Sequence, residues 1–105
     1  MLRFLTLLLV LFTGVLLQSN APIQDAPDGA QLFKKNCKVC HGKDASKETK
    51  KIPNLLKSTL ELDAMNQIVT AGKETMPAFG ETLNAAEIQA VLTYVQELQN
   101  AVGDE

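Results

Sequence analysis

Tryptophan is absent from this 105-residue chain, and beyond residue 21 only three aromatic side chains occur, Phe33, Phe79 and Tyr94. A domain this small with so few large apolar side chains usually needs an additional stabilising element, such as a disulfide or a bound metal. A disulfide between Cys37 and Cys40 would stabilise the fold little, because a bridge across two residues closes almost no loop. The sequence therefore predicts that another group fills the core.

Positive charge is scarce as well. Beyond residue 21 the chain has nine lysines and no arginine against 12 aspartates and glutamates, a net charge of −3. This mildly acidic balance argues against nucleic acid as a partner. The charge is uneven: residues 34–51 hold seven lysines and two acids, whereas residues 52–105 hold two lysines and eight acids. Two interpretations stay open, ordinary solvated faces or a basic rim that steers an acidic partner.

The one long apolar run stands at the start of the chain. Phe4–Leu17 spans 14 residues, which suits a signal-peptide core and falls short of the roughly 20 residues that a membrane-spanning helix needs. Ser19 and Ala21 place small residues before a cleavage point, although Pro22 after that point hinders cleavage. We therefore expect residues 1–21 to be a signal peptide of an exported protein, or an N-terminal anchor if they are retained.

The rest of the chain predicts an all-α domain. Residues 22–27 are interpreted as a linker and residues 28–105 as the domain. Alternation of apolar and polar residues is missing beyond the leader, so no strands are expected. Asp28 predicts an N-cap for a helix that reaches Cys37, and Gly42 would end that region.

Two further helices are predicted by apolar residues at helical spacing. The first surrounds Met65 and stops at Gly72. The second starts at Asn84, which together with Glu87 resembles a capping box. Its apolar stripe consists of Ile88, Val91, Leu92, Val95 and Leu98. Residues 43–51 are polar and are expected to form an exposed loop.

The stretch Cys37-Lys38-Val39-Cys40-His41 contains both cysteines and the only histidine. A zinc site needs four ligands, so a carboxylate or a second chain would have to supply the fourth. A thioredoxin-like dithiol would normally lie beside a parallel sheet, for which no strands are predicted. Covalent haem attachment is the third interpretation, and Cys-x-x-Cys-His is its signature, because two thiols add to the two vinyl groups and the next residue brings an imidazole to the iron. The pattern favours haem.

One covalently attached haem c would also fill the core. With His41 as the first axial ligand and no second histidine, a methionine is the natural second ligand. Met65 lies on an apolar helix face, where methionine usually fills a core. Met76 lies in a predicted loop, residues 73–83, and Pro77 holds it out of the helical conformation. Met76 is therefore the predicted ligand and Met65 the alternative.

From Gly29 to Leu98 the chain resembles the class I c-type cytochromes, the small monohaem electron carriers. The likeness rests on Gly29 and Phe33, eight and four positions before Cys37, on CKVCHG, on IPNL, and on GKETMPAFG, which resembles the distal-methionine loop of algal and cyanobacterial carriers. It implies a small cytochrome c fold, with three to four helices wrapped around one covalently bound haem. Cys37 and Cys40 would form its thioethers.

The resemblance implies roles for further residues. Gly29 would let the first helix cross the last one closely, opposite the aromatic ring of Tyr94. Pro53 would offer its backbone carbonyl to the ring N–H of His41, which fixes the tautomer of the ligand. The chain departs from the family in the short stretch between His41 and Met76 and in lacking a tryptophan near the haem propionates.

With both axial positions filled, no site remains for a substrate, so we expect an electron-transfer protein and no enzyme. It would cycle between Fe(III) and Fe(II) with a protein donor and a protein acceptor of a respiratory or photosynthetic chain, docking transiently near the haem edge. The alternatives are a permanently bound or membrane-tethered haem subunit of a larger oxidoreductase, a dithiol redox protein, and an enzyme whose haem binds peroxide or a gas after Met76 detaches. The expected location is the periplasm or a thylakoid-lumen-like compartment, with membrane contact only if the leader is retained.

Overall fold

A computed structural model describes residues 26–104, and all the regular secondary structure in that range is helical. The predicted leader, residues 1–21, and the first part of the predicted linker, residues 22–25, lie outside the described residues. The elements are α2 (Gly29–Asn36), α3 (Lys38–His41), the 3-10 helix η1 (Leu55–Lys57), α4 (Leu62–Ala71) and α5 (Ala85–Gly103). Within residues 26–104 there is no strand, only an isolated backbone bridge between Lys73 and Met76. The predicted all-α class is confirmed.

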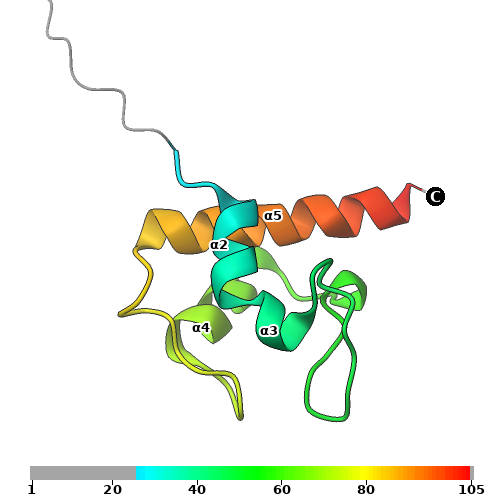
Figure 1. Ribbon diagram of the computed structural model, residues 1–105, viewed down its shortest axis with the longest axis horizontal. Coiled ribbons are helices and arrows are strands. Elements are labelled where there is room, and N and C mark those ends of the chain that lie inside the picture. The colour runs from blue at the N-terminus through cyan, green and yellow to red at the C-terminus, as the bar shows by residue number, and fades with distance from the viewer. Residues whose placement is uncertain (1–25, 105) are drawn as a thin grey trace, which may run out of the picture.

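Helices α2, α4 and η1 pack against α5, and α3 packs against α2. Helix α5 begins with the predicted capping box: the Asn84 side chain accepts from the Glu87 N–H at 2.9 Å, and the Glu87 carboxylate accepts from the Asn84 N–H at 3.0 Å. The predicted apolar stripe is buried at Ile88, Val91, Leu92 and Val95. Helix α2 runs across α5, and α3, α4 and the two long loops all lie on one side of α5 (Figure 1).

The crossing of α2 and α5 depends on Gly29. A Cβ at this position would lie 2.1 Å from the Ala90 carbonyl oxygen, so only glycine permits the approach. One turn further on, Phe33 is 1% exposed and its ring lies 5.5 Å from that of Tyr94, centre to centre, at 59°. Burying a phenylalanine contributes about 2 kcal/mol, and the tilted pair adds to it. The close crossing opposite Tyr94 is confirmed.

Two apolar clusters use the same helix. The first contains Phe33, Ala45, Val91 and Val95 and joins α2 and the loop after α3 to α5. The second contains Met65, Leu83, Ile88 and Leu92 and joins α4 to α5. Leu32 packs against both clusters, so α2 contributes to each of them. The fold therefore consists of two small packing units that share α5.

Two local expectations need correction. The first helix does not run through Cys37: α2 ends at Asn36, and α3 begins after Cys37 and ends at His41, capped by Gly42, whose φ is 82°. The loop at residues 43–51 is exposed at its lysines, but Ala45 within it is fully buried, with φ at 65°. Sequence polarity could not reveal this, because the side chains around Ala45 in the sequence are polar or charged while its methyl group packs in the core.

Candidate functional site

The two cysteines and the histidine lie on one short turn. The Cys37 N–H donates to the last-turn carbonyl of Phe33 at 2.8 Å, and the N–H groups of Cys40 and His41 donate to the Cys37 carbonyl at 3.2 and 2.9 Å. Gly42 then closes α3 in a conformation with positive φ that most residues avoid. The backbone therefore holds the three side chains within one helical turn, directly after α2.

The two thiols differ in environment. Cys37 is half-buried against the Phe33 cluster, Cys40 is exposed, and neither is in a disulfide. Burial, followed by the nearby Cys40, raises the pKa of the Cys37 thiol to about 11. Cys37 is therefore protonated at neutral pH, whereas dithiol exchange needs a thiolate. This environment does not favour the dithiol interpretation.

His41 is the one buried polar residue of the described core, with 9% of its surface exposed. Its Nδ1 atom is buried and makes no hydrogen bond to any described residue. Burial lowers the pKa of His41 below its ordinary value of 6.5, so the imidazole is neutral at pH 7. A neutral imidazole is the form that binds a metal ion.

This donor set fits a covalently attached haem. Two thiols without a disulfide and a neutral imidazole stand on one turn, in the order that haem attachment requires. The orphaned Nδ1 also needs an acceptor, as metal-bound histidines usually have on their second nitrogen. Pro53 follows in the chain as an exposed residue, and its carbonyl makes no bond to His41 in this structure. Its predicted role stays a prediction.

The two candidate methionines lie in different surroundings. Met65 is 8% exposed and packs in the second cluster with Leu83 and Leu92. Met76 is partly exposed and lies in the loop between α4 and α5, just before Pro77. Core packing accounts for Met65, and nothing in the apolar core accounts for Met76.

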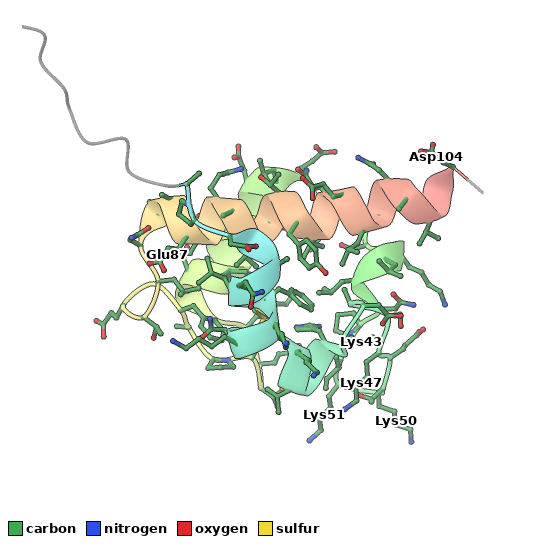
Figure 2. All side chains as sticks on the ribbon, turned by 45° about the horizontal axis from the view of Figure 1, so that its top comes forward. Lys43, Lys47, Lys50, Lys51, Glu87 and Asp104 are labelled. Atoms are coloured by element: carbon green, nitrogen blue, oxygen red, sulfur yellow. The ribbon has the colours of Figure 1, made fainter. Side chains whose placement is uncertain are left out.

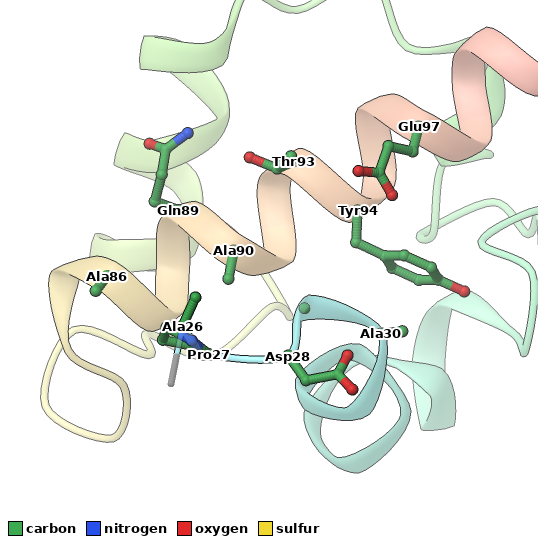
Figure 3. A pocket seen from close by; sticks show the side chains of 11 residues that line it. Ala26, Pro27, Asp28, Ala30, Ala86, Gln89, Ala90, Thr93, Tyr94 and Glu97 are labelled. Atoms are coloured by element: carbon green, nitrogen blue, oxygen red, sulfur yellow. The ribbon is translucent and has the colours of Figure 1, made fainter. Parts of the chain in front are cut away.

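Other kinds of site find little support in the described residues. Within residues 26–104, no three His, Cys, Asp or Glu side chains gather to hold a metal ion such as zinc. A groove of about 450 Å³ lies between the segment before α2 and the outer face of α5 (Figure 3). It is lined by residues such as Pro27, Ala90 and Tyr94, and by none of the predicted haem residues.

Sequence reasoning missed the residues that support the loop after His41. The Leu55 N–H donates to the carbonyl of buried Ala45 at 3.1 Å, and the Gln99 side chain on α5 donates to the Leu55 carbonyl at 2.8 Å. These bonds tie the loop to α5. An alanine within a polar run is the only sequence signal, and it does not identify Gln99, which lies 44 positions after its partner Leu55.

Comparison with known proteins now adds to this geometry. The family described as cytochrome c oxidase, cbb3-type, subunit III matches residues 24–95. Cytochrome c6 of Gloeothece citriformis is 41% identical over 96 residues, covering 87% of this chain and 86% of the relative. Cytochrome c6 of Rippkaea orientalis is 39% identical over 103 residues, covering 89% and 90%, and a cytochrome c6-like protein of Nostoc is 36% identical over 103 residues, covering 90% and 92%.

The matched region includes the Cys-x-x-Cys-His turn and all the described helices but the end of α5. The relatives bear the name of small c-type cytochromes, and the turn itself offers the two thiols and the neutral imidazole that such proteins need. The chain therefore belongs to the cytochrome c family, as a small monohaem electron-transfer protein with one covalently attached haem c.

Proposed function

We propose that this protein is a mobile carrier that passes single electrons from a protein donor to a protein acceptor of a photosynthetic or respiratory chain. Haem c supplies the Fe(III)/Fe(II) couple. Cys37 and Cys40 would hold it through thioethers, His41 and Met76 would bind its iron, and the Pro53 carbonyl would accept from His41 Nδ1. The buried, unpartnered Nδ1 of His41 beside two thiols on one turn is the observation that carries this assignment.

The properties of His41 and Met76 explain why such a site would transfer electrons and would not bind a substrate. Burial lowers the pKa of His41, so the imidazole stays neutral, and it limits contact with water. A thioether from Met76 would stabilise Fe(II) relative to Fe(III) and raise the potential. With both axial positions occupied, no position is left for a substrate, so we propose no catalytic activity of its own.

The surface around the motif suits transient docking. Val39, between the two cysteines, is 81% exposed, so an apolar side chain faces solvent within the motif. Lys43, Lys47, Lys50 and Lys51 gather beyond α3, away from Glu87 and Asp104 near the two ends of α5 (Figure 2). An acidic protein surface is the complementary partner. Docking would be weak, so that donor and acceptor separate quickly.

Export to the periplasm or a thylakoid-lumen-like compartment is part of the proposal. Its support is the leader pattern in residues 1–21. Among the described residues, no helix has the length and apolar character to cross a membrane. The mass of the mature protein tests the leader: loss of residues 1–21 supports a free carrier, and the full-length mass supports an anchored one.

A second candidate is a haem subunit held within a larger oxidoreductase. The description of the matching family as an oxidase subunit favours it. Fractionation of the native organism separates the two candidates. A free carrier appears in the soluble exported fraction as a single small haem protein, whereas a subunit stays with a membrane complex through a high-salt wash.

The ligand assignment is tested by changing Met76 to alanine in the haem-loaded protein. We expect the haem to stay attached, the weak near-infrared band of ferric methionine ligation to vanish, and the potential to fall by roughly 0.1 V or more, within the range that axial ligands span. Met65→Leu is the matched control, since it removes the other thioether at a cost below about 1.5 kcal/mol. Loss of the band in Met65→Leu instead would transfer the assignment to Met65.

A further inference from the structure

The loop between α4 and α5 begins with a tight backbone turn that ends at Met76. The Lys73 N–H donates to the Met76 carbonyl at 3.1 Å, and the Met76 N–H donates to the Lys73 carbonyl at 2.9 Å. Within this turn Glu74 has φ of 54°, a conformation that non-glycine residues adopt only where the surroundings enforce it. Met76 is therefore at the end of a closed turn, although it lies in an exposed loop.

The loop then returns to the last turn of α4. The N–H groups of Phe79 and Gly80 donate to the carbonyls of Val69 and Thr70 at 2.8 and 3.1 Å. These carbonyls are among the last four of the helix, which have no partner within it. The segment from Gly72 to Gly80, here called the clip, is thus bonded to itself at its start and to α4 at its end.

The two glycines at the ends of the clip permit this arrangement. Gly72 has φ of 78°, and a Cβ there would lie 2.9 Å from both the Met76 carbonyl oxygen and the Ala78 nitrogen. A Cβ on Gly80 would lie 2.9 Å from the Thr70 carbonyl oxygen. Real Cβ atoms almost never approach backbone atoms this closely. Gly72 therefore does more than end α4: the backbone from Met76 to Ala78 passes directly over its α-carbon.

We propose that Gly72 and Gly80 are positioning residues that hold Met76 in place. The clip would thereby determine the fraction of molecules in which the thioether is detached from the iron. The proposal rests on the proposed role of Met76 as an axial ligand. The contacts give the reason: a methyl group on either glycine must displace the segment that carries Met76 or the helix end that holds it. Such a displacement raises the fraction of molecules in which the sixth position is open.

An external ligand measures this open fraction. A ligand that binds only the open form has an apparent affinity equal to its intrinsic affinity multiplied by the fraction of molecules that is open. Cyanide is a suitable probe of the ferric, haem-loaded protein, because its binding is followed optically and needs no redox partner. A tenfold larger open fraction should therefore give a tenfold lower apparent Kd for cyanide, equivalent to about 1.4 kcal/mol.

The experiment compares cyanide titrations of the wild-type protein with Gly72→Ala, Gly80→Ala and Met76→Ala. We expect Met76→Ala to bind cyanide most tightly, because its sixth position is always open. Gly72→Ala and Gly80→Ala should lie between, with apparent Kd lowered by roughly tenfold and a weaker near-infrared band. Amide hydrogen exchange on the same proteins should be faster at Phe79 and Gly80 than in the wild type, since these N–H groups bond to α4.

Gly29→Ala is the matched control. It introduces the same methyl group at another close backbone approach, 2.1 Å from the Ala90 oxygen, but at the crossing of α2 and α5. It should lower overall stability and leave cyanide affinity within about twofold of the wild type. Gly72→Asn adds a second check. Asparagine tolerates positive φ, yet it carries the same Cβ. If a collision with the Met76 backbone is the cause, Gly72→Asn should bind cyanide as tightly as Gly72→Ala.

The outcomes separate the two proposals. If Met76→Ala binds cyanide no more tightly than the wild type, Met76 is not the ligand and the proposed site fails. If Met76→Ala binds cyanide tightly while Gly72→Ala and Gly80→Ala match the wild type, the proposed positioning role of the two glycines is overturned. The assignment of Met76 as the axial ligand is then retained. Equal effects in Gly29→Ala and Gly72→Ala would also overturn the positioning role, because general destabilisation would then explain both. Should Gly72→Ala fail to fold, Gly80→Ala decides.

Discussion

At the residue scale, the chemistry depends on a contrast between neighbours of the same type. Cys37 and Cys40 are three positions apart, yet one packs against the core and the other faces solvent. His41 is buried one position after an exposed thiol. The spacing of the motif predicted which residues form the site. It could not predict these burials, because they follow from where the turn meets the Phe33 cluster.

This contrast predicts unequal thiol reactivity in the haem-free protein. A pKa of about 11 leaves about one Cys37 in a thousand as thiolate at pH 8. Iodoacetamide should therefore modify exposed Cys40 first, and the rate at Cys37 should rise about tenfold per pH unit up to about pH 11. Peptide mass spectrometry after short labelling measures both rates. Equal rates in native buffer, with the same equality in urea, would contradict the burial of Cys37.

At the scale of elements, local signals identified the helices and missed what joins them. The Asn84–Glu87 capping box and the stripe on α5 are patterns within one segment, and both are confirmed. The break after Asn36 has no signal within its own segment, and the burial of Ala45 depends on contacts with Val91 and Val95 of α5. The close packing of the clip on Gly72 was missed for the same reason. The sequence shows that Gly72 ends α4, but it does not reveal which part of the backbone passes over this glycine.

The crossing of α2 and α5 predicts a large effect from one methyl group. Gly29→Ala should reduce the free energy of unfolding by about 1–3 kcal/mol, because the Ala90 carbonyl cannot move without shifting α5. Urea unfolding of the haem-loaded protein, followed by circular dichroism, measures it. Gly103→Ala serves as the control, because a Cβ there has nothing within 4 Å. A loss of the same size at Gly103 would show that the crossing is not the cause.

The cap of α5 predicts a smaller effect. Asn84→Ala removes the oxygen that accepts from the Glu87 N–H, and it should cost about 1 kcal/mol in the free energy of unfolding. Asn84→Ser keeps a capping oxygen and should recover most of that loss. Thermal unfolding of the three proteins side by side tests the cap. An Asn84→Ser variant as unstable as Asn84→Ala would rule out capping as the reason.

At the scale of the whole molecule, the local charge near the motif differs in sign from the net charge. The chain carries a formal net charge of −2, yet the lysines at residues 43–51 gather beyond α3. A small anionic oxidant such as ferricyanide should therefore be attracted to the site, and its reaction should slow as salt is added. If the net charge governed the encounter, the same reaction would accelerate.

Stopped-flow oxidation of the reduced protein over a range of ionic strength measures this sign. Lys50→Glu/Lys51→Glu should flatten or reverse the salt dependence, since it changes the local charge by four. Gln89→Glu adds negative charge in the groove on the outer face of α5 and should leave the slope nearly unchanged. A slope that is insensitive to the lysine changes would place electron exit elsewhere on the surface.

The packing of α2 on α5 also governs when the chain can fold. Phe33 and Gly29 meet their partners, Tyr94 and Ala90, about sixty residues later in the sequence, and both apolar clusters draw on α5. A ribosome or a translocation channel releases the chain from its N-terminus, so the core cannot close until the last helix has emerged. Until then the cysteine turn stays accessible, which gives the haem-attaching machinery a period in which to act before the domain closes.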